Sequence, residues 1–316
     1  MTELRRIAPG RLLAPALAVL AALVTSGCSE KEKPLGPAPP TTISVGGASA
    51  LVPFLRRAGD RFEQADRGVV VEVRAASTAE AIDRLCRRRL PVAAASRLMT
   101  VAEREACRRE GIVTRTVAVA HQAVAIVTDP RLGIDCMEAG ELRRLWRPRS
   151  SVVRYDQLDG RYPTQPVRLF GPPPEVDTFD FFTGEVVGEE GAARRDYTPL
   201  VAFDRLVERV AGTRGALGFG GLAELRRHAA EVALPAVDAG QGCVRPTVAA
   251  VRGGDYPLAR PLYFHVSLEG LRRRRLGRFL QLVAARAERL AEETGLVGLG
   301  AREQERARGV LGEPVR

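Results

Sequence analysis

Residues 167–183 read VRLFGPPPEVDTFDFFT, and this stretch predicts a strand, a turn and a helix in immediate succession. The apolar residues at its start suit a buried strand, and the three consecutive prolines exclude helix from the turn. A helix is expected to begin at Thr178, whose hydroxyl would lie at its cap. The first backbone N–H groups of such a helix have no partner within it, so they offer a place for an oxyanion.

Two residues of the turn conflict with an anion site. Asp177 puts a carboxylate where the anion would lie, and like charges repel. Val176 supplies no side-chain donor. The stretch therefore predicts an oxyanion site that has been altered.

Strands and amphipathic helices alternate along the chain from Thr42 onward. Strands are expected at 43–45, 69–73, 92–95, 113–119 and 123–127, with helices over 51–66, 79–89 and 100–110. Further helices are expected at 142–146, 200–210 and 272–294, with a glycine-rich strand after 212–215 and a proline-bounded strand at 257–266. This order predicts an α/β fold with largely parallel sheets.

Small hydroxyl residues follow several of these strands. In α/β sheets, ligands bind beyond the carboxyl ends of the strands. A serine or threonine before a helix is often only a cap, and the arginine of this set could equally form a surface salt bridge. Recurrence at successive strand ends favours a shared polar ligand, held by Ser49, Ala50, Ser77, Thr78, Ser96, Arg97 and Thr178.

The N-terminus predicts export. Three arginines precede the uncharged run Leu12–Val24, which would span roughly 20 Å as a helix, short of the roughly 30 Å of a bilayer core. Residues 1–27 are therefore expected to be a signal peptide. The small residues before Cys28 resemble a lipoprotein signal, in which this cysteine becomes the lipid-bearing first residue. A plain secretory signal with an incidental cysteine is the alternative. Residues 28–40 predict an extended tether.

The formal charge of +10 is carried almost entirely by arginine, since Lys31 and Lys33 are the only lysines. Nucleic acid is one partner for such a charge, but the arginines are scattered in pairs on helical stretches and alternate with glutamate. A solvated, arginine-rich surface is the better interpretation, and no nucleic-acid partner is expected.

Four further cysteines, Cys86, Cys107, Cys136 and Cys243, follow the signal region. None shows the spacing of a metal site with another cysteine or a histidine, so neither a metal nor a cofactor is expected. Outside the cytoplasm two disulfides are the natural expectation, and three pairings are possible on arithmetic alone.

A string of ordered motifs resembles the phosphate-binding component of the bacterial phosphate ABC importer, a family of type II periplasmic solute-binding proteins. The resemblance runs from about Ile43 to beyond His265. Its strongest pieces are Ala95–Arg97, Cys136–Trp146, Leu169–Pro172, Thr178–Thr183, Asp196–Thr198, Val210–Gly212, Gly215–Phe219, Gly242–Val244 and Tyr256–Leu262.

The resemblance implies two α/β lobes with mixed sheets, joined by a hinge of crossing strands. Lobe 1 is expected to comprise residues 41–122 and 238–316, and lobe 2 residues 123–237. The resemblance further implies disulfides between Cys86 and Cys107 and between Cys136 and Cys243. It implies a monomer without enzymatic activity that is anchored through Cys28 to the periplasmic or extracellular face of the cell membrane and delivers phosphate, or a related oxyanion, to an ABC permease.

The ligand positions depart from the family pattern. A serine and threonine at the first strand end are Ser49 and Ala50 here, and Ala79 replaces a glycine. The Ser-Gly-Thr of the main anion loop becomes Val176, Asp177 and Thr178. Each lost hydrogen bond to a charged ligand would cost roughly 1.5–3 kcal/mol, so two or three losses would remove about three to six decades of affinity.

Asp177 leaves three roles open. Its carboxylate would accept the proton of hydrogen phosphate, form a salt bridge with Arg97, or face solvent. The two functional hypotheses are accordingly an oxyanion carrier and a degenerate receptor or sensor that no longer binds phosphate tightly. An enzyme is the third and weakest, because no nucleophile elbow is present and His121 lies in an apolar strand where packing is its usual role.

Overall fold

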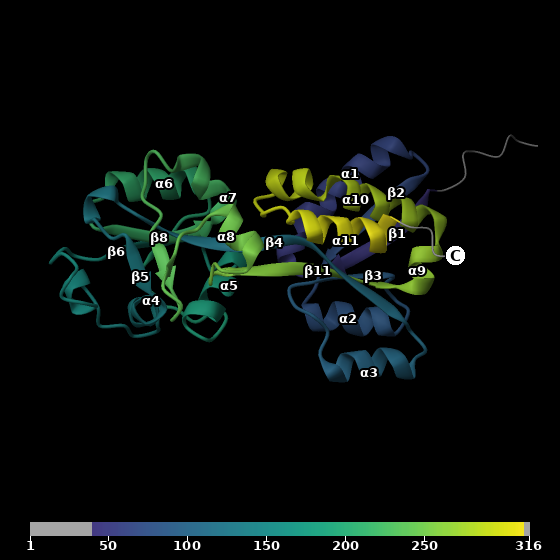
Figure 1. Cartoon of the computed structure of the whole chain (residues 1–316), viewed down its shortest axis with the longest axis horizontal. Coiled ribbons are helices and arrows are strands. Elements are labelled where there is room, and N and C mark those ends of the chain that lie inside the picture. Colours follow the sequence, from purple (N-terminus) through teal and green to yellow (C-terminus); the bar gives the residue numbers. More distant parts are fainter. Residues whose placement is uncertain (1–39, 313–316) are drawn as a thin grey trace, which may run out of the picture. The chain divides into compact units, whose positions relative to one another are not determined.

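A mixed eight-stranded sheet runs through the part of the chain, residues 40–312, that the computed structural model describes (Figure 1). The strand order is β2-β1-β3-β11-β4-β8-β6-β7, and a three-stranded sheet has the order β10-β9-β5. The predicted signal peptide, Cys28 and all of the predicted tether except Pro40 lie outside the described residues.

The strands alternate with helices along most of the chain, as the sequence predicts. The strands are β1 Thr41–Gly47, β2 Val69–Ala75, β3 Val92–Ala95, β4 Thr114–Thr128, β5 Cys136–Glu138, β6 Arg168–Gly171, β7 Thr198–Pro199, β8 Ala216–Gly221, β9 Ala236–Asp238, β10 Cys243–Val244 and β11 Ala259–Ser267. The helices are α1 Val52–Ala65, α2 Thr78–Cys86, α3 Val101–Arg109, α4 Ala139–Trp146, α5 Asp177–Val186, α6 Phe203–Gly212, α7 Leu222–Leu225, α8 Val248–Gly253, α9 Leu268–Arg272, α10 Arg274–Glu293 and α11 Ala301–Gly312. A short 3₁₀ turn, η1 Ser49–Leu51, follows β1.

The first hydrophobic core forms around β1, β2 and β3, where β1 pairs in parallel with both neighbours. Helices α1, α10 and α11 cover one face of this sheet, and α2 and α3 cover the other (Figure 1). Phe62 of α1 meets Phe279 of α10 edge to face, with 5.6 Å between ring centroids. Such contacts place the apolar stripe of each helix on the sheet.

The second core is rich in aromatic side chains. It packs α4, α5 and α6 against β6 and β8. Phe182 stacks on Phe219 with 3.7 Å between centroids, and Trp146 meets both rings edge to face. A side chain at Gly171 would come within 2.8 Å of the Phe219 ring, so only glycine fits there.

Strands β4 and β11 belong to both cores. On β4, Val117 and Val119 lie in the first cluster and Val124 in the second. The prediction of two strands at 113–119 and 123–127 is wrong in this respect, because one continuous strand pairs with β11 across His121 and Gln122. Continuous pairing satisfies the backbone groups of the crossing segment.

The lobe boundaries at residues 122 and 237 stay a prediction. The second cluster includes Val251, Tyr256 and Leu258, which the sequence assigns to lobe 1. Their packing favours a boundary nearer Leu258 than residue 238.

Two disulfides connect the pairs of cysteines that the family resemblance implies. Cys86 bonds to Cys107 and Cys136 bonds to Cys243, with Cα–Cα distances of 4.4 and 6.0 Å. The first joins α2 to α3, and the second joins β5 to β10. Both pairings are therefore confirmed.

Two kinds of feature are absent from residues 40–312. No helix in this range has both the length and the apolar character needed to cross a bilayer. No three or more histidine, cysteine, aspartate or glutamate side chains within it are grouped so that they could hold a metal ion.

Replacing Cys136 and Cys243 by serine is expected to lower the free energy of unfolding by about 2–4 kcal/mol, because the bond closes a loop of 107 residues. The matched control removes Cys86 and Cys107, whose loop of 21 residues predicts a cost smaller by about 1 kcal/mol. Urea unfolding can be followed by fluorescence of the single, buried Trp146. An unchanged midpoint in the Cys136/Cys243 variant would contradict this expectation.

Candidate functional site

The predicted ligand residues of the first core gather at one edge of the sheet. Because β1, β2 and β3 run in parallel, their carboxyl ends lie side by side. Gly47 makes this junction tight: its φ is 142°, and a side chain there would come 1.8 Å from the carbonyl oxygen of Ala94. Ser49 follows β1, Ser77 follows β2 and Ser96 follows β3.

Helix α5 carries the residues that the second core contributes. Its start is one residue earlier than predicted, since Val176 is the N-cap and Asp177 is the first helical residue. Val176 makes no side-chain cap bond, because it has no polar atom. Phe179 and Phe182 are buried in the aromatic core, and their packing sets the orientation of the helix N-terminus.

The carboxylate of Asp177 is the centre of the candidate site. Ser49 Oγ donates a hydrogen bond to its Oδ1 at 2.7 Å, and Gln122 Nε2 donates to its Oδ2 at 2.5 Å. Arg260 Nη2 lies 3.7 Å from the same Oδ2. The three partners come from η1, β4 and β11, so residues far apart in sequence converge on one carboxylate.

Arg260 supplies the positive charge of this site. Its guanidinium stacks on the ring of Phe181, 4.3 Å from the centroid, and its Nε donates to Gln122 Oε1 at 2.9 Å. Burial lowers the pKa of Arg260 from its usual range, and the nearby Asp177 carboxylate acts in the opposite direction. An arginine keeps its proton at all ordinary pH values, so a poorly hydrated positive charge remains beside Asp177.

Sequence reasoning missed Gln122 and Arg260 as site residues. Arg260 lies within the Tyr256–Leu262 motif. It is a single arginine in a largely apolar, proline-bounded strand, and this contrast could have marked it as a site residue. Gln122 carried no comparable signal.

The other predicted ligand residues do not contact Asp177 in any recorded hydrogen bond among residues 40–312. Thr78 Oγ1 accepts from the backbone N–H of Ser96 at 3.0 Å and lies 3.1 Å from Ser96 Oγ, so these two are joined. Ser77 caps α2 by accepting from the backbone N–H of Glu80 at 3.1 Å. Thr178, on the first turn of α5, is half-buried. Ala50 offers no side-chain donor, and its methyl group packs against the first core.

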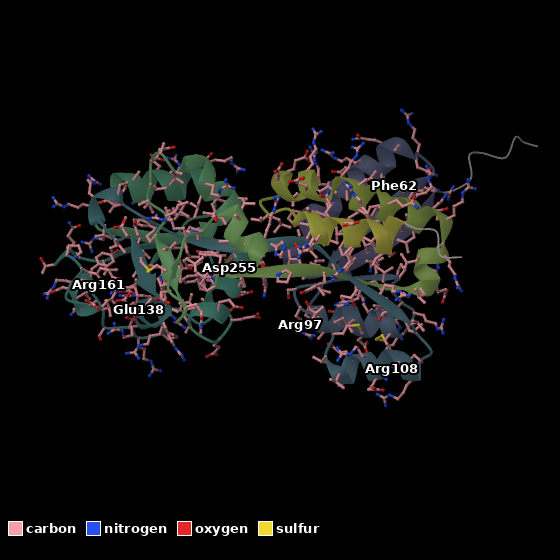
Figure 2. The ribbon with its side chains drawn as sticks, in the orientation of Figure 1. Phe62, Arg97, Arg108, Glu138, Arg161 and Asp255 are labelled. Carbon is pink, nitrogen blue, oxygen red and sulfur yellow. A yellow bond between two sulfur atoms is a disulfide. The ribbon has the colours of Figure 1, made fainter. Side chains whose placement is uncertain are left out.

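Arg97 does not meet Asp177, so a salt bridge between them is ruled out as the role of either residue. Both terminal nitrogens of Arg97 (labelled in Figure 2) bond instead to the carboxylate of Glu103, at 2.8 and 2.9 Å. Glu103 also completes a capping box with Thr100 at the start of α3. Glu103, six residues along the chain, therefore holds the Arg97 guanidinium with two parallel hydrogen bonds and keeps it away from Asp177.

His121 has a structural role. Its side chain is 7% exposed, and its Nε2 lies 2.8 Å from Glu303 Oε2 of α11. Its backbone pairs with Val297 in both directions. The packed interpretation of this histidine therefore holds.

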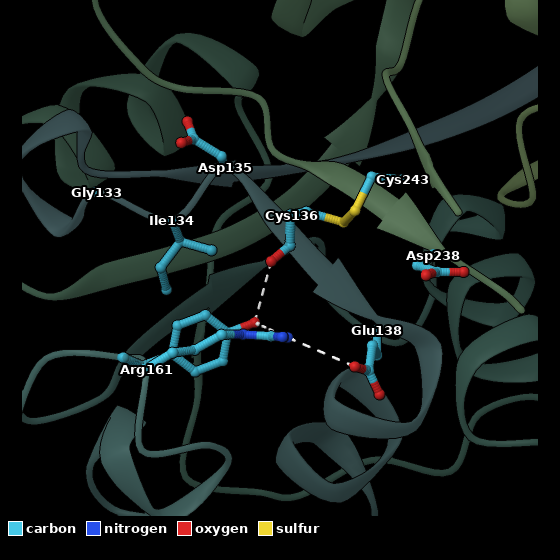
Figure 3. Close-up of a pocket in the computed structure, with 9 residues that line it drawn as sticks. Gly133, Ile134, Asp135, Cys136, Glu138, Arg161, Asp238 and Cys243 are labelled. Carbon is cyan, nitrogen blue, oxygen red and sulfur yellow. Dashed lines mark hydrogen bonds and ion pairs between the residues drawn. A yellow bond between two sulfur atoms is a disulfide. The ribbon is translucent and has the colours of Figure 1, made fainter. Parts of the chain in front are cut away.

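A separate pocket of about 340 Å³ lies beside the Cys136–Cys243 disulfide (Figure 3). Its rim carries three carboxylates, those of Asp135, Glu138 and Asp238, against the single guanidinium of Arg161. This excess of negative charge disfavours an anion.

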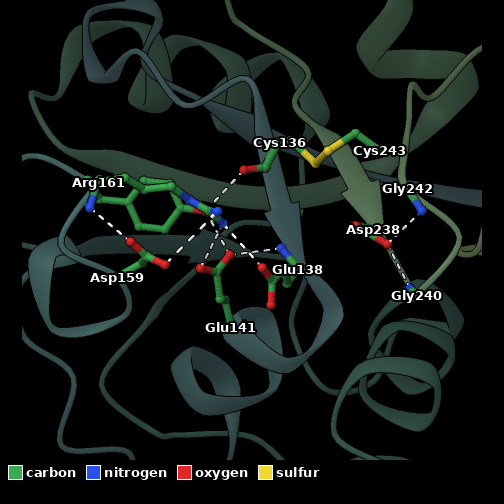
Figure 4. The surroundings of a disulfide bond; sticks show 10 residues. Cys136, Glu138, Glu141, Asp159, Arg161, Asp238, Gly240, Gly242 and Cys243 are labelled. Carbon is green, nitrogen blue, oxygen red and sulfur yellow. Dashed lines mark hydrogen bonds and ion pairs between the residues drawn. A yellow bond between two sulfur atoms is a disulfide. The ribbon is translucent and has the colours of Figure 1, made fainter.

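Three of the charged groups of this pocket, those of Glu138, Arg161 and Asp238, are already partnered (Figure 4). Arg161 Nη2 lies 3.0 Å from Glu141 Oε1 and 3.6 Å from Glu138 Oε1. Asp238 Oδ1 accepts from the backbone N–H groups of Gly240 and Gly242 at 2.7 and 3.0 Å. These contacts brace the disulfide-linked strands and leave the Asp177 site as the better candidate.

The family assignment follows from comparison with known proteins. The PBP superfamily domain matches residues 36–285, most of the chain. The chain belongs to the PBP superfamily. This membership, with the mixed sheet and two cores, confirms the predicted α/β fold of a two-lobed type II binding protein.

Relatives of known name cover most of the chain. Protein SphX from Synechocystis sp. is 27% identical over 263 residues, which cover 82% of this chain and 78% of that protein. The phosphate-binding protein PstS of Staphylococcus aureus is 19% identical over 253 residues, covering 79% and 76%.

Solved structures agree with this assignment. A possible phosphate binding protein from Planctomyces limnophilus superposes with a TM-score of 0.82 at 27% identity, over 88% of this chain and 100% of that one. An ABC-type phosphate transport receptor from Vibrio cholerae gives 0.63 at 15% identity, over 81% and 99%, and supports the fold alone. The family is one of binding receptors, and the chain is not an enzyme, as the sequence predicts.

Replacing Glu103 by glutamine is expected to lower the free energy of unfolding at neutral pH by about 0.5–1 kcal/mol, a figure already reduced for solvent screening at the half-exposed Arg97. The hydrogen bond from Arg97 lowers the pKa of Glu103 from 4.5 to about 2. A carboxylate with a depressed pKa stabilises above its unfolded pKa and loses that contribution as the pH falls toward about 2.

Urea titrations of both proteins at several pH values test this expectation. The difference between wild type and variant should shrink between pH 4.5 and about pH 2. A difference that stays constant through this range would refute a role for the ionised carboxylate.

Proposed function

We propose that this chain is an extracytoplasmic solute-binding protein that captures phosphate or a related oxyanion. One observation carries the proposal: Ser49, Gln122 and Arg260 converge on the two oxygens of one carboxylate. Donors that hold carboxylate oxygens also suit the oxygens of phosphate, since both present negatively charged acceptors.

The ligand would lie between Ser49 and the N-terminus of α5. Thr178 would add a hydroxyl donor from the first turn, and the N-terminus of α5 would add the favourable end of the helix dipole. Arg260 would supply the charge, in place of the predicted Arg97. Ser77, Thr78 and Ser96 would line the neighbouring strand ends. Relatives named as phosphate-binding proteins support phosphate as the first ligand to test.

The cellular setting belongs to the same proposal. A signal peptide over residues 1–27 would export the chain, and lipid on Cys28 would anchor it to the cell membrane. The bound oxyanion would pass to the permease of an ABC importer.

Calorimetric titration of the protein from Ser29 onward tests the function directly. Phosphate at millimolar concentration is expected to give saturable heat. Sulfate, arsenate and a simple phosphonate, titrated in parallel, define the ligand class. Absence of heat with all four anions would refute the proposal.

Replacing Arg260 by methionine is expected to weaken phosphate binding by roughly 10- to 150-fold, because a hydrogen bond to a charged group contributes about 1.5–3 kcal/mol. Methionine keeps an apolar stem against Phe181, so the fold should persist.

The matched control is Arg97→Met, measured by the same titration. Since Arg97 is already paired with Glu103, this change should alter the affinity by less than about threefold. A larger loss at Arg97 than at Arg260 would reverse the two assignments.

A receptor or sensor that binds no phosphate is the second candidate function. The observation in its favour is that Asp177 already satisfies the donors with a carboxylate of the protein itself. The titration above separates the two candidates.

A further inference from the structure

We infer that Asp177 is a tethered competitor of the ligand: its carboxylate occupies the oxyanion donors and ties the two cores together until an anion displaces it. This inference rests on the proposed function for the identity of the displacing anion. In the ligand-free protein Asp177 would hold the two cores together, and this can be tested without phosphate.

The Asp177 carboxylate contacts residues outside its own helix. An aspartate at the start of a helix commonly accepts from its own first backbone N–H groups. Among residues 40–312, the recorded hydrogen bonds of this carboxylate come from Ser49 and Gln122 instead. The side chain therefore serves an interaction outside its own helix.

Both oxygens of the Asp177 carboxylate have partners. Oδ1 accepts from Ser49, while Oδ2 accepts from Gln122 and lies near Arg260. The side chains of Asp177 and Arg260 are each only 20% exposed. A half-buried carboxylate with partners on both oxygens occupies these donors as an anionic ligand would, so a second anion can use them only after Asp177 leaves.

The hydrogen bond between Ser49 and Asp177 joins elements that pack in different cores. Ser49 begins η1, directly before Leu51 and α1 of the first core. Asp177 begins α5, whose Phe179 and Phe182 belong to the second core. A side chain of the protein therefore bridges an element of the first core and an element of the second.

The Asp177 side chain can be displaced by rotation alone. Rotation about the side-chain bonds of Asp177 would free the donors without moving the backbone of α5, which the aromatic core holds. Asp177 would rotate away only when another anion takes its place. Without such an anion, the positive charge of Arg260 would lose its carboxylate partner. Ligand binding and Asp177 release are therefore coupled.

The experiment compares wild type with Asp177→Gly, both as the chain from Ser29. Small-angle X-ray scattering in phosphate-free buffer reports the radius of gyration, and calorimetry reports the phosphate affinity. The variant is expected to have the larger radius without ligand and to contract when phosphate is added. Its affinity should rise by roughly tenfold or more, since no competitor remains.

Two further variants serve as controls. Asp180→Asn removes a negative charge from the same helix but none of the recorded bonds to Ser49 or Gln122, so it should match wild type in radius and stay within about threefold in affinity. Ser49→Ala removes one bridging bond and one ligand donor together, so it should expand the free protein and weaken phosphate binding. Near-wild-type thermal unfolding of each variant guards against misfolding.

The outcomes separate the inference from the function on which it rests. Equal radius and equal phosphate affinity in wild type and Asp177→Gly would overturn the inference and leave the proposed function standing. Expansion of the variant with no phosphate heat from either protein would support the link between the cores and overturn the proposed function. A larger effect from Asp180→Asn than from Asp177→Gly would also overturn the inference, because general charge would then be the cause.

Discussion

The Asp177 carboxylate and the three side chains that meet it link an element of the first core to an element of the second. Asp177 lies at the start of a helix fixed by aromatic packing, and Ser49, Gln122 and Arg260 reach it from a 3₁₀ turn and two crossing strands. Each partner belongs to a different element, so the contact forms only when the whole arrangement is folded. The donors that meet this carboxylate are of the kind that would also hold the oxygens of a bound oxyanion.

Much of the fold could be predicted from the sequence, because it depends on local signals. Alternating apolar strands and amphipathic helices, the turn of three prolines and the hydroxyl residues at strand ends all have local physical causes. The start of α5 was placed one residue late, since the threonine gave a stronger capping signal than Val176. The crossing strand β4 was read as two pieces because His121 and Gln122 interrupt its apolar pattern.

The composition of the site could be predicted only in part, because its pairings are between distant residues. Ser49 and Asp177 were both expected, but their hydrogen bond joins positions 128 residues apart. Arg97 was expected to face an anion or Asp177, whereas Glu103 on the next helix captures it with two hydrogen bonds. Arg260 lies beside Asp177 instead, because the register of β11 on β4 sets it opposite Gln122.

A crystal structure of the protein from Ser29, grown with phosphate in excess, tests the central claim most directly. The account predicts a tetrahedral anion bonded to Ser49, Gln122 and Arg260, with the Asp177 side chain rotated away from all three. Phosphate bound elsewhere, with Asp177 still holding Ser49 and Gln122, would contradict it.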